Sequence, residues 1–87
     1  MANIASQLKR IQRSERERQQ NRLYTSQVKT CFRRLRAAAE AGDREAVEAE
    51  HRMLTSRIDR AVHVGALHRN NGARKKARAA RIRGQSG

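Results

Sequence analysis

The chain has 87 residues and carries 21 Lys plus Arg against 8 Asp plus Glu, which gives a formal net charge of +13 at pH 7. A chain of this length forms one small domain at most, and its thin core excludes an enzyme with a deep pocket. A single Cys excludes the internal disulfide framework of a small secreted protein. The longest apolar run, residues 37–39, is too short for a signal peptide or a membrane span.

Arginine supplies 17 of the 21 basic residues, and its planar guanidinium binds phosphate through paired hydrogen bonds. A compact domain with this charge repels itself unless a polyanion lies alongside. The charge is +8 over residues 1–36, −2 over residues 37–60 and +7 over residues 61–87. The sequence therefore predicts a nucleic-acid partner that is held by two basic ends around a near-neutral centre.

Residues 1–22 are predicted to form a basic helical arm that continues into the first helix of the bundle. Residues 12–22 contain no apolar side chain, yet their helix propensities are good. Glu15 and Glu17 can form ion pairs along the helix, with Arg18, Arg13 or Arg22. The arm presents cations in several directions for phosphate binding, namely Lys9, Arg10, Arg13, Arg16, Arg18 and Arg22. A disordered basic tail in the free protein is the alternative.

An antiparallel pair of helices follows the arm. Apolar residues at steps of three and four predict a first stripe made of Tyr24, Val28, Cys31, Phe32, Leu35, Ala38 and Ala39. A second stripe contains Val47, Leu54, Ile58, Ala61 and Val62. Between them Gly42 suits a left-handed turn position and Asp43 suits the next N-cap. This short turn makes the two helices neighbours whose stripes face each other.

A third helix is predicted after Gly65, with its start between His68 and Asn71 and a loose tail at residues 84–87. Small residues at steps of four and three predict its buried seam, Ala73, Ala77 and Ala80. Such a seam buries little area, so this helix is the most easily frayed. The predicted fold is all-α, with residues 23–87 forming an antiparallel three-helix bundle.

Two groups of residues in the bundle are candidates for phosphate binding. On the first helix the cations fall within about 60° of one another on a helical wheel, beside the apolar stripe, and they are Arg22, Lys29, Arg33 and Arg36. In the second group, residues 68–78 mix cations and hydrogen-bonding side chains at a helix start, where free backbone amides favour phosphate. The alternatives are an ordinary solvated face for the first group and a capped basic helix without specific contacts for the second.

The sequence contains no pattern of residues for catalysis or metal binding. The three His residues lack paired metal spacing, and Cys31 lies on the apolar stripe, which indicates an inert thiol. Tyr24 and Phe32 also lie on that stripe, so we do not expect base stacking on aromatic platforms. We expect no enzyme activity, metal, cofactor or small-molecule substrate, and recognition through backbone charge and shape.

Short motifs follow one another in a characteristic order along nearly the whole chain. They are Met1-Ala2-Asn3-Ile4, Lys9-Arg10, Ser14-Glu15, Arg18, Asn21, Ser26, Lys29-Thr30, Arg33-Arg34, Ala41-Gly42-Asp43, Gly65, Leu67-His68-Arg69-Asn70, Ala73-Arg74 and Lys76. Together they resemble the bacterial small-subunit ribosomal protein S20 family. Asn71-Gly72 departs from the family pattern, which usually has a basic residue and Ala, and Gly72 predicts a less stable start of the third helix.

The resemblance implies a monomer docked among RNA helices of the small ribosomal subunit, in the cytoplasm and away from membranes. It implies direct binding to small-subunit ribosomal RNA and stabilisation of RNA folding during assembly, without catalysis. The matching positions and the basic faces together give the predicted RNA-binding set: Lys9, Arg10, Arg13, Arg16, Arg18, Asn21, Arg22, Ser26, Lys29, Arg33, Arg34, Arg36, His68, Arg69, Asn70, Arg74, Lys75, Lys76 and Arg78.

Two other functions fit parts of the composition. A nonspecific, nucleoid-type DNA-binding protein would also be small, helical and basic. A cationic amphipathic protein at anionic membranes is the less suitable alternative, because the apolar stripes are used between the helices and no Trp is available for insertion. Affinity for structured ribosomal RNA against random duplex DNA at matched salt distinguishes these functions.

Overall fold

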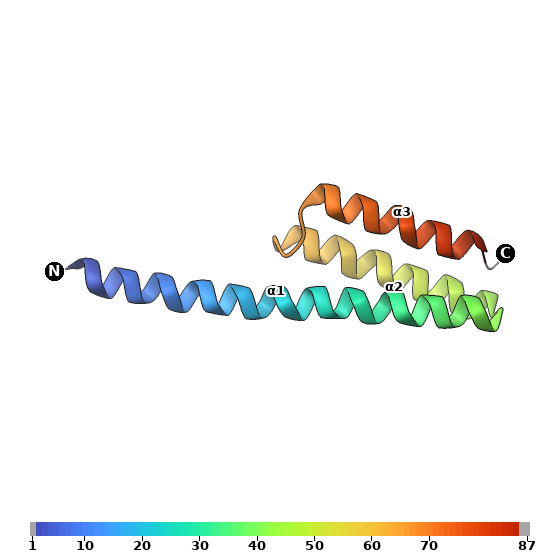
Figure 1. Ribbon diagram of the computed structural model, residues 1–87, viewed down its shortest axis with the longest axis horizontal. Coiled ribbons are helices and arrows are strands. Elements are labelled where there is room, and N and C mark those ends of the chain that lie inside the picture. Colours follow the sequence, from blue (N-terminus) through green and yellow to red (C-terminus); the bar gives the residue numbers. More distant parts are fainter. Residues whose placement is uncertain (1, 86–87) are drawn as a thin grey trace.

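A computed structural model describes residues 2–85, with side chains described for residues 7–84. Within this part the chain forms three helices and no strand, α1 (Ala2–Ala41), α2 (Arg44–His63) and α3 (Arg69–Gln85). The chain reverses direction at both connections, so α1 and α3 run parallel to each other and antiparallel to α2 (Figure 1). The prediction of an all-α bundle is confirmed.

The first half of α1 extends beyond the other two helices (Figure 1). Forty residues at 1.5 Å per residue span about 60 Å, which accounts for the longest dimension of the molecule, 64 Å. The radius of gyration is 17.2 Å, against about 12 Å for a compact chain of this length. Side chains 7–20 are all exposed, and the expected Arg13–Glu17 ion pair joins Nε and Oε1 at 3.4 Å. This half of α1 has no tertiary core.

α1 and α2 each end in a Schellman motif. Gly42 and Gly65 adopt positive φ, 71° and 83°, as the left-handed position requires. The N–H of the next residue then bonds back to the helix, Asp43 to the Ala38 oxygen at 3.3 Å and Ala66 to the Ala61 oxygen at 2.8 Å. The Asp43 carboxylate also accepts a hydrogen bond from the Ala46 N–H, as an N-cap of α2. The tight turn predicted at residues 41–43 is confirmed.

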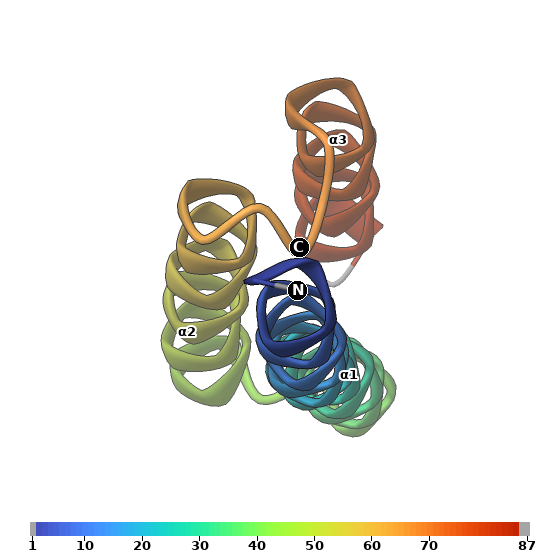
Figure 2. The ribbon, with the colours of Figure 1, turned by 90° about the vertical axis from the view of Figure 1, so that its left-hand side faces the viewer.

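The core lies mainly between α1 and α2, and α3 covers it so that the helices form a triangle when seen end-on (Figure 2). Leu35, Leu54 and Ile58 have no exposed surface. The other buried apolar residues on these two helices are Val28, Cys31, Phe32, Ala38, Val47 and Ala61. All nine belong to the two stripes predicted from the sequence, which therefore face each other as expected.

The predicted seam of α3 is wrong. Ala73, Ala77 and Ala80 are exposed, whereas Gly72 and Ala79 are buried and Ile82 packs against the core. An alanine is tolerated on either face of a helix, so an alanine-rich segment does not define which face is buried. Two residues assigned to the loose tail, 84 and 85, belong to α3, and residues 86 and 87 lie outside the described part of the chain.

Gly72 lies where α3 packs closely against α2, whereas the other glycine of α3, Gly84, has open space around it. A Cβ on Gly72 would lie 2.5 Å from Cγ2 of Val62, well inside van der Waals contact. Because Val62 is β-branched, its χ1 is stiff and it cannot easily turn away. The glycine that sequence analysis treated as a weakness of α3 therefore permits its packing.

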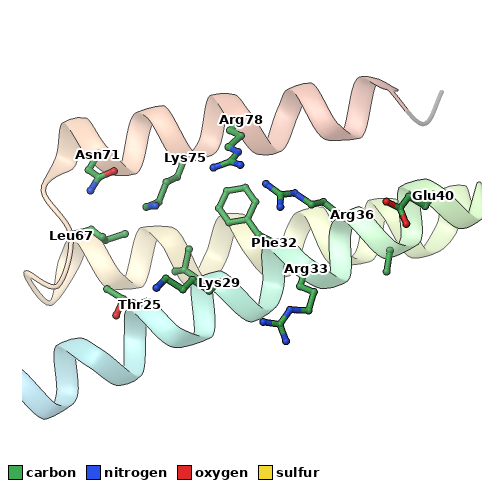
Figure 3. A pocket seen from close by; sticks show the side chains of 12 residues that line it. Thr25, Lys29, Phe32, Arg33, Arg36, Glu40, Leu67, Asn71, Lys75 and Arg78 are labelled. Carbon is green, nitrogen blue, oxygen red and sulfur yellow. The ribbon is translucent and has the colours of Figure 1, made fainter.

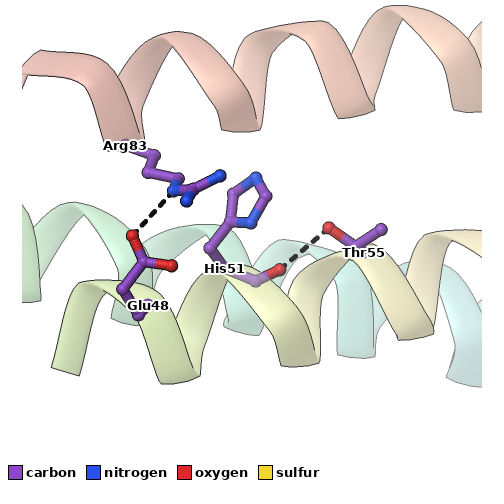
Figure 4. A network of polar contacts seen from close by, with 4 residues as sticks. All are labelled: Glu48, His51, Thr55 and Arg83. Carbon is purple, nitrogen blue, oxygen red and sulfur yellow. Dashed lines mark hydrogen bonds and ion pairs between the residues drawn. The ribbon is translucent and has the colours of Figure 1, made fainter. Parts of the chain in front are cut away.

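Two ion pairs also join α3 to α2. Lys76 Nζ contacts the Asp59 carboxylate, and Arg83 Nε donates to Glu48 Oε1 at 2.8 Å (Figure 4). All four side chains are about half exposed, so each pair is worth at most about 1 kcal/mol. The pairs direct the cations on this side of α3 toward the acidic residues of α2.

Replacing Gly72 by Ala should lower the free energy of unfolding by about 1 kcal/mol. The steric conflict with Val62 costs about 1–3 kcal/mol, which outweighs a gain of about 1 kcal/mol in helix propensity. Shortening the neighbour as well, in a V62A/G72A double variant, should recover that loss relative to V62A alone. Urea denaturation followed by circular dichroism measures the resulting double-mutant cycle.

Gly84→Ala is the control for this cycle, because nothing lies within 4 Å of a Cβ at that position. It should leave stability unchanged or slightly higher. If Gly72→Ala alone stabilised the protein, the close packing of Gly72 on Val62 would be contradicted.

Candidate nucleic-acid interface

A groove of about 850 Å³ lies between α1 and α3 (Figure 3). α1 contributes Lys29, Arg33 and Arg36, and α3 contributes Lys75 and Arg78. Glu40 is the one acidic residue in the lining. The groove therefore carries a local excess of four positive charges, which is the electrostatic requirement for an anionic ligand.

Helical spacing explains how the fold builds the two walls of this groove. Lys29, Arg33 and Arg36 are four and three residues apart, and so are Asn71, Lys75 and Arg78, so each set lies on one face of its helix. Since α1 and α3 run in the same direction, the two rows are aligned. Figure 3 shows the α3 row pointing toward α1, whereas Arg33 points away from α3.

Apolar side chains form the inner surface of the groove. Val28 and Phe32 are buried core residues with 2% and 8% of their surface exposed, and Leu67 from the α2–α3 connection is partly buried beside them. Cζ of Arg78 lies 5.6 Å from the centre of the Phe32 ring, within cation–π range. Phe32 thus belongs to the core, as predicted, and also orients a cation at the groove.

The predicted residues of the arm are distributed around α1. Lys9, Arg10, Arg13, Arg16 and Arg18 are exposed, which agrees with cations that point in several directions. Arg18, Asn21 and Arg22 border a shallow hollow on α1 together with Ser14, Glu17 and Thr25. Because Thr25 also lines the groove, the cationic surface continues from the arm into the bundle.

Several predicted RNA-binding residues lie outside the groove. Ser26 and Arg34 line a separate cleft of about 250 Å³ between α1 and α2, together with Arg57. On α3 the residues Arg69, Asn70 and Arg74 are exposed but do not line the groove, and Lys76 is paired with Asp59. The predicted set therefore covers several faces.

His68 has a structural role that sequence analysis did not assign. Its Nδ1 accepts a hydrogen bond of 3.1 Å from the Asn70 N–H, so its side chain caps the start of α3. An RNA contact by this exposed side chain would be made by the rest of the ring. A His68 substitution would therefore perturb α3 and is not a clean test of binding.

Seven residues that line the groove are absent from the predicted set: Thr25, Val28, Phe32, Ala37, Glu40, Leu67 and Asn71. Asn71 could have been found, because it precedes Lys75 by four residues and Arg78 by seven and so shares their helix face. Leu67 could not, because it lies in a connection whose path the sequence pattern does not define.

The Cys31 thiol lies in the seam between α1 and α2, with 5% of the residue exposed. Burial raises the pKa of this thiol, and the positive charges of Arg57 and Arg34 only partly oppose the effect. The thiolate is the reactive form, so the raised pKa and the burial both make this cysteine unreactive in the folded protein.

Neither a metal site nor a membrane-spanning helix is present among the described residues. Between residues 7 and 84, no group of three or more His, Cys, Asp and Glu side chains is arranged to hold a metal ion. None of the three helices in the described part of the chain has an apolar stretch that could span a membrane.

A bundle of helices with a cationic arm and a cationic groove belongs to the class of small basic proteins that bind polyanions. The chain belongs to the ribosomal protein S20 family, described as "Ribosomal protein S20", which matches residues 2–82. This confirms the resemblance identified in the sequence.

Relatives from three organisms match along most of their length. The chain is 48% identical over 77 residues to the small ribosomal subunit protein bS20 of Corynebacterium diphtheriae, covering 88% of each chain. It is 47% identical to bS20 of Acaryochloris marina, covering 94% of this chain and 95% of the relative. For bS20 of Beutenbergia cavernae the identity is 42%, covering 88% and 90%.

Alkylation of Cys31 by iodoacetamide should be much slower in the folded protein than in urea at the same pH. The physical reason is the combination of low exposure and raised pKa, which lowers both access and thiolate fraction. With rising pH the folded-state rate should still increase beyond about pH 8.5, where an ordinary Cys is half ionised. Mass spectrometry of timed samples gives both rates, and equal rates with and without urea would contradict the buried position.

Proposed function

We propose that this chain is a structural constituent of the small ribosomal subunit that binds small-subunit ribosomal RNA directly and stabilises its folding during assembly. It acts as a monomer within the ribosome, in the cytoplasm, and catalyses no reaction. The observation that carries the proposal is the continuous cationic surface that runs along α1 from the arm to the groove. Membership of the ribosomal protein S20 family supports ribosomal RNA over nucleoid DNA as the partner.

The division of the chain into an arm, residues 1–22, and a bundle, residues 23–87, is the basis of the proposed binding mode. Residues 2–20 of α1 span about 28 Å as a helix. They present cations around the helix, which suits an arm lying between phosphate backbones of neighbouring RNA segments. In the bundle, most of the cations belong to α1 and α3, the two helices that form the groove.

We propose three surfaces of contact with RNA phosphates. The arm contributes Lys9, Arg10, Arg13, Arg16, Arg18, Asn21 and Arg22. The groove contributes Lys29, Arg33, Arg36, Lys75 and Arg78. The third surface consists of predicted residues outside the arm and the groove, namely Ser26, Arg34, His68, Arg69, Asn70, Arg74 and Lys76. Because all of these residues except His68 belong to helices, binding requires little ordering of loops.

The affinity for a small-subunit ribosomal RNA transcript should fall steeply with salt. If six to ten phosphates are neutralised, the slope of log affinity against log salt is roughly −4 to −9. Neutralising three exposed arm cations, in the variant R10Q/R16Q/R18Q, should make the slope less negative by about 2 to 3. Filter binding over a series of salt concentrations measures both slopes.

Arg44→Gln with Arg52→Gln is the matched control, because both side chains are exposed on α2 and belong to none of the three surfaces. Its slope should change far less than that of the arm variant. An affinity that hardly depends on salt, or equal affinity for random duplex DNA at the same salt, would contradict the proposed function.

A further inference from the structure

The groove between α1 and α3 has more than the cations that a phosphate backbone requires. Its lining also includes apolar side chains, of which Leu67 and Ala37 are accessible, and its volume of about 850 Å³ lies within the range of clefts that enclose small ligands, about 300–1,000 Å³. Phosphates lying across the two rims would leave this apolar surface in contact with water. The occupant should therefore have an apolar planar part as well as an anionic part.

The polar groups of the groove are placed where such an occupant would need them. Lys29 and Arg36 on α1 and Lys75 on α3 carry charge at the rims, while Asn71 supplies a neutral amide that can donate and accept hydrogen bonds (Figure 3). The guanidinium of Arg78 lies over the Phe32 ring, and a guanidinium plane is itself a surface on which nucleobases stack. Amide, guanidinium and apolar wall together match the edge and the face of a nucleobase.

We propose that this groove binds an unpaired nucleotide of the RNA, with the base against the apolar wall and Arg78 and the phosphate between the rim cations. This inference rests on the proposed function and names the ligand of one of its surfaces. It revises the expectation that recognition uses backbone charge and shape alone, because Arg78 on Phe32 provides a stacking surface that the sequence did not indicate. The net positive charge of the groove excludes a basic or neutral segment, and the apolar side chains in its lining favour a nucleotide over a duplex backbone.

The test compares two RNA hairpins that differ in one nucleotide, using the full chain. One has a single 2-aminopurine bulge in its stem and the other has a fully paired stem. At one fixed salt concentration the protein should prefer the bulged hairpin by about fivefold or more, because stacking of one base contributes on that scale. The fluorescence of 2-aminopurine should change on binding as the base enters the groove.

Two variants that keep the fold separate the nucleotide pocket from a merely charged groove. Asn71→Ala removes the amide without changing the charge, and Arg78→Lys keeps the charge but removes the planar group. Each should lower the preference for the bulged hairpin about fivefold, the scale of one hydrogen bond or stacking contact, with little effect on the paired hairpin. The matched controls are Gln20→Ala, another exposed amide on a helix, and Arg81→Lys, an exposed Arg on α3 outside the groove.

The outcomes distinguish this inference from the proposed function. Equal affinity of the wild-type protein for both hairpins, with binding to the ribosomal RNA transcript retained, would overturn the nucleotide pocket alone. Failure to bind the transcript as well would overturn the proposed function. If an acidic helical peptide bound in an Asn71-dependent way and the bulged hairpin did not, the occupant would be a protein and our inference would be wrong.

Discussion

Repulsion among the basic side chains is the constraint that governs how charge is distributed over the three helices. Half of the acidic residues lie in α2, and two of them, Glu48 and Asp59, pair with cations of α3. The cations on the other side of α3 face those of α1 across the groove, with Glu40 as the acid in its lining. An anion that enters between these walls converts a repulsive contact into two attractive ones, so binding should also draw α1 and α3 together.

The sequence was sufficient to predict the fold where side chains are large or turns are sharply defined. Branched and aromatic residues such as Leu35 and Ile58 can be buried on one face only, so their spacing fixed how α1 and α2 face each other. Gly42 and Asp43 have strong conformational and capping preferences, so the turn between these helices was also predictable. The rotation of α3 was not, because its small residues carry almost no information about burial and Gly72 makes its contribution by having no side chain.

The same difficulty limited the prediction of the candidate interface. The cations of α1 and those of α3 could be recognised separately, since each set follows helical spacing. Their meeting across one groove depends on the rotation of α3, which Gly72, Ala79 and Ile82 determine through packing. Leu67 was missed because it lies in a connection, and Asn71 was left out although it shares the helix face of Lys75 and Arg78. Phe32 was assigned to the core without its contact to Arg78.

The arm and one wall of the groove belong to the same uninterrupted helix, α1. A helix advances about 1.5 Å and turns about 100° with each residue. Insertion of one residue near position 22 would therefore lengthen the molecule only slightly, yet it would turn every arm cation by about 100° around the axis relative to Lys29 and Arg36. Four inserted residues would leave a rotation of only about 40°, and seven would leave about 20°. The number of residues in α1 thus fixes the angle, about the helix axis, between the cations of the arm and those of the groove. Insertions should be tolerated only in steps close to whole helical turns.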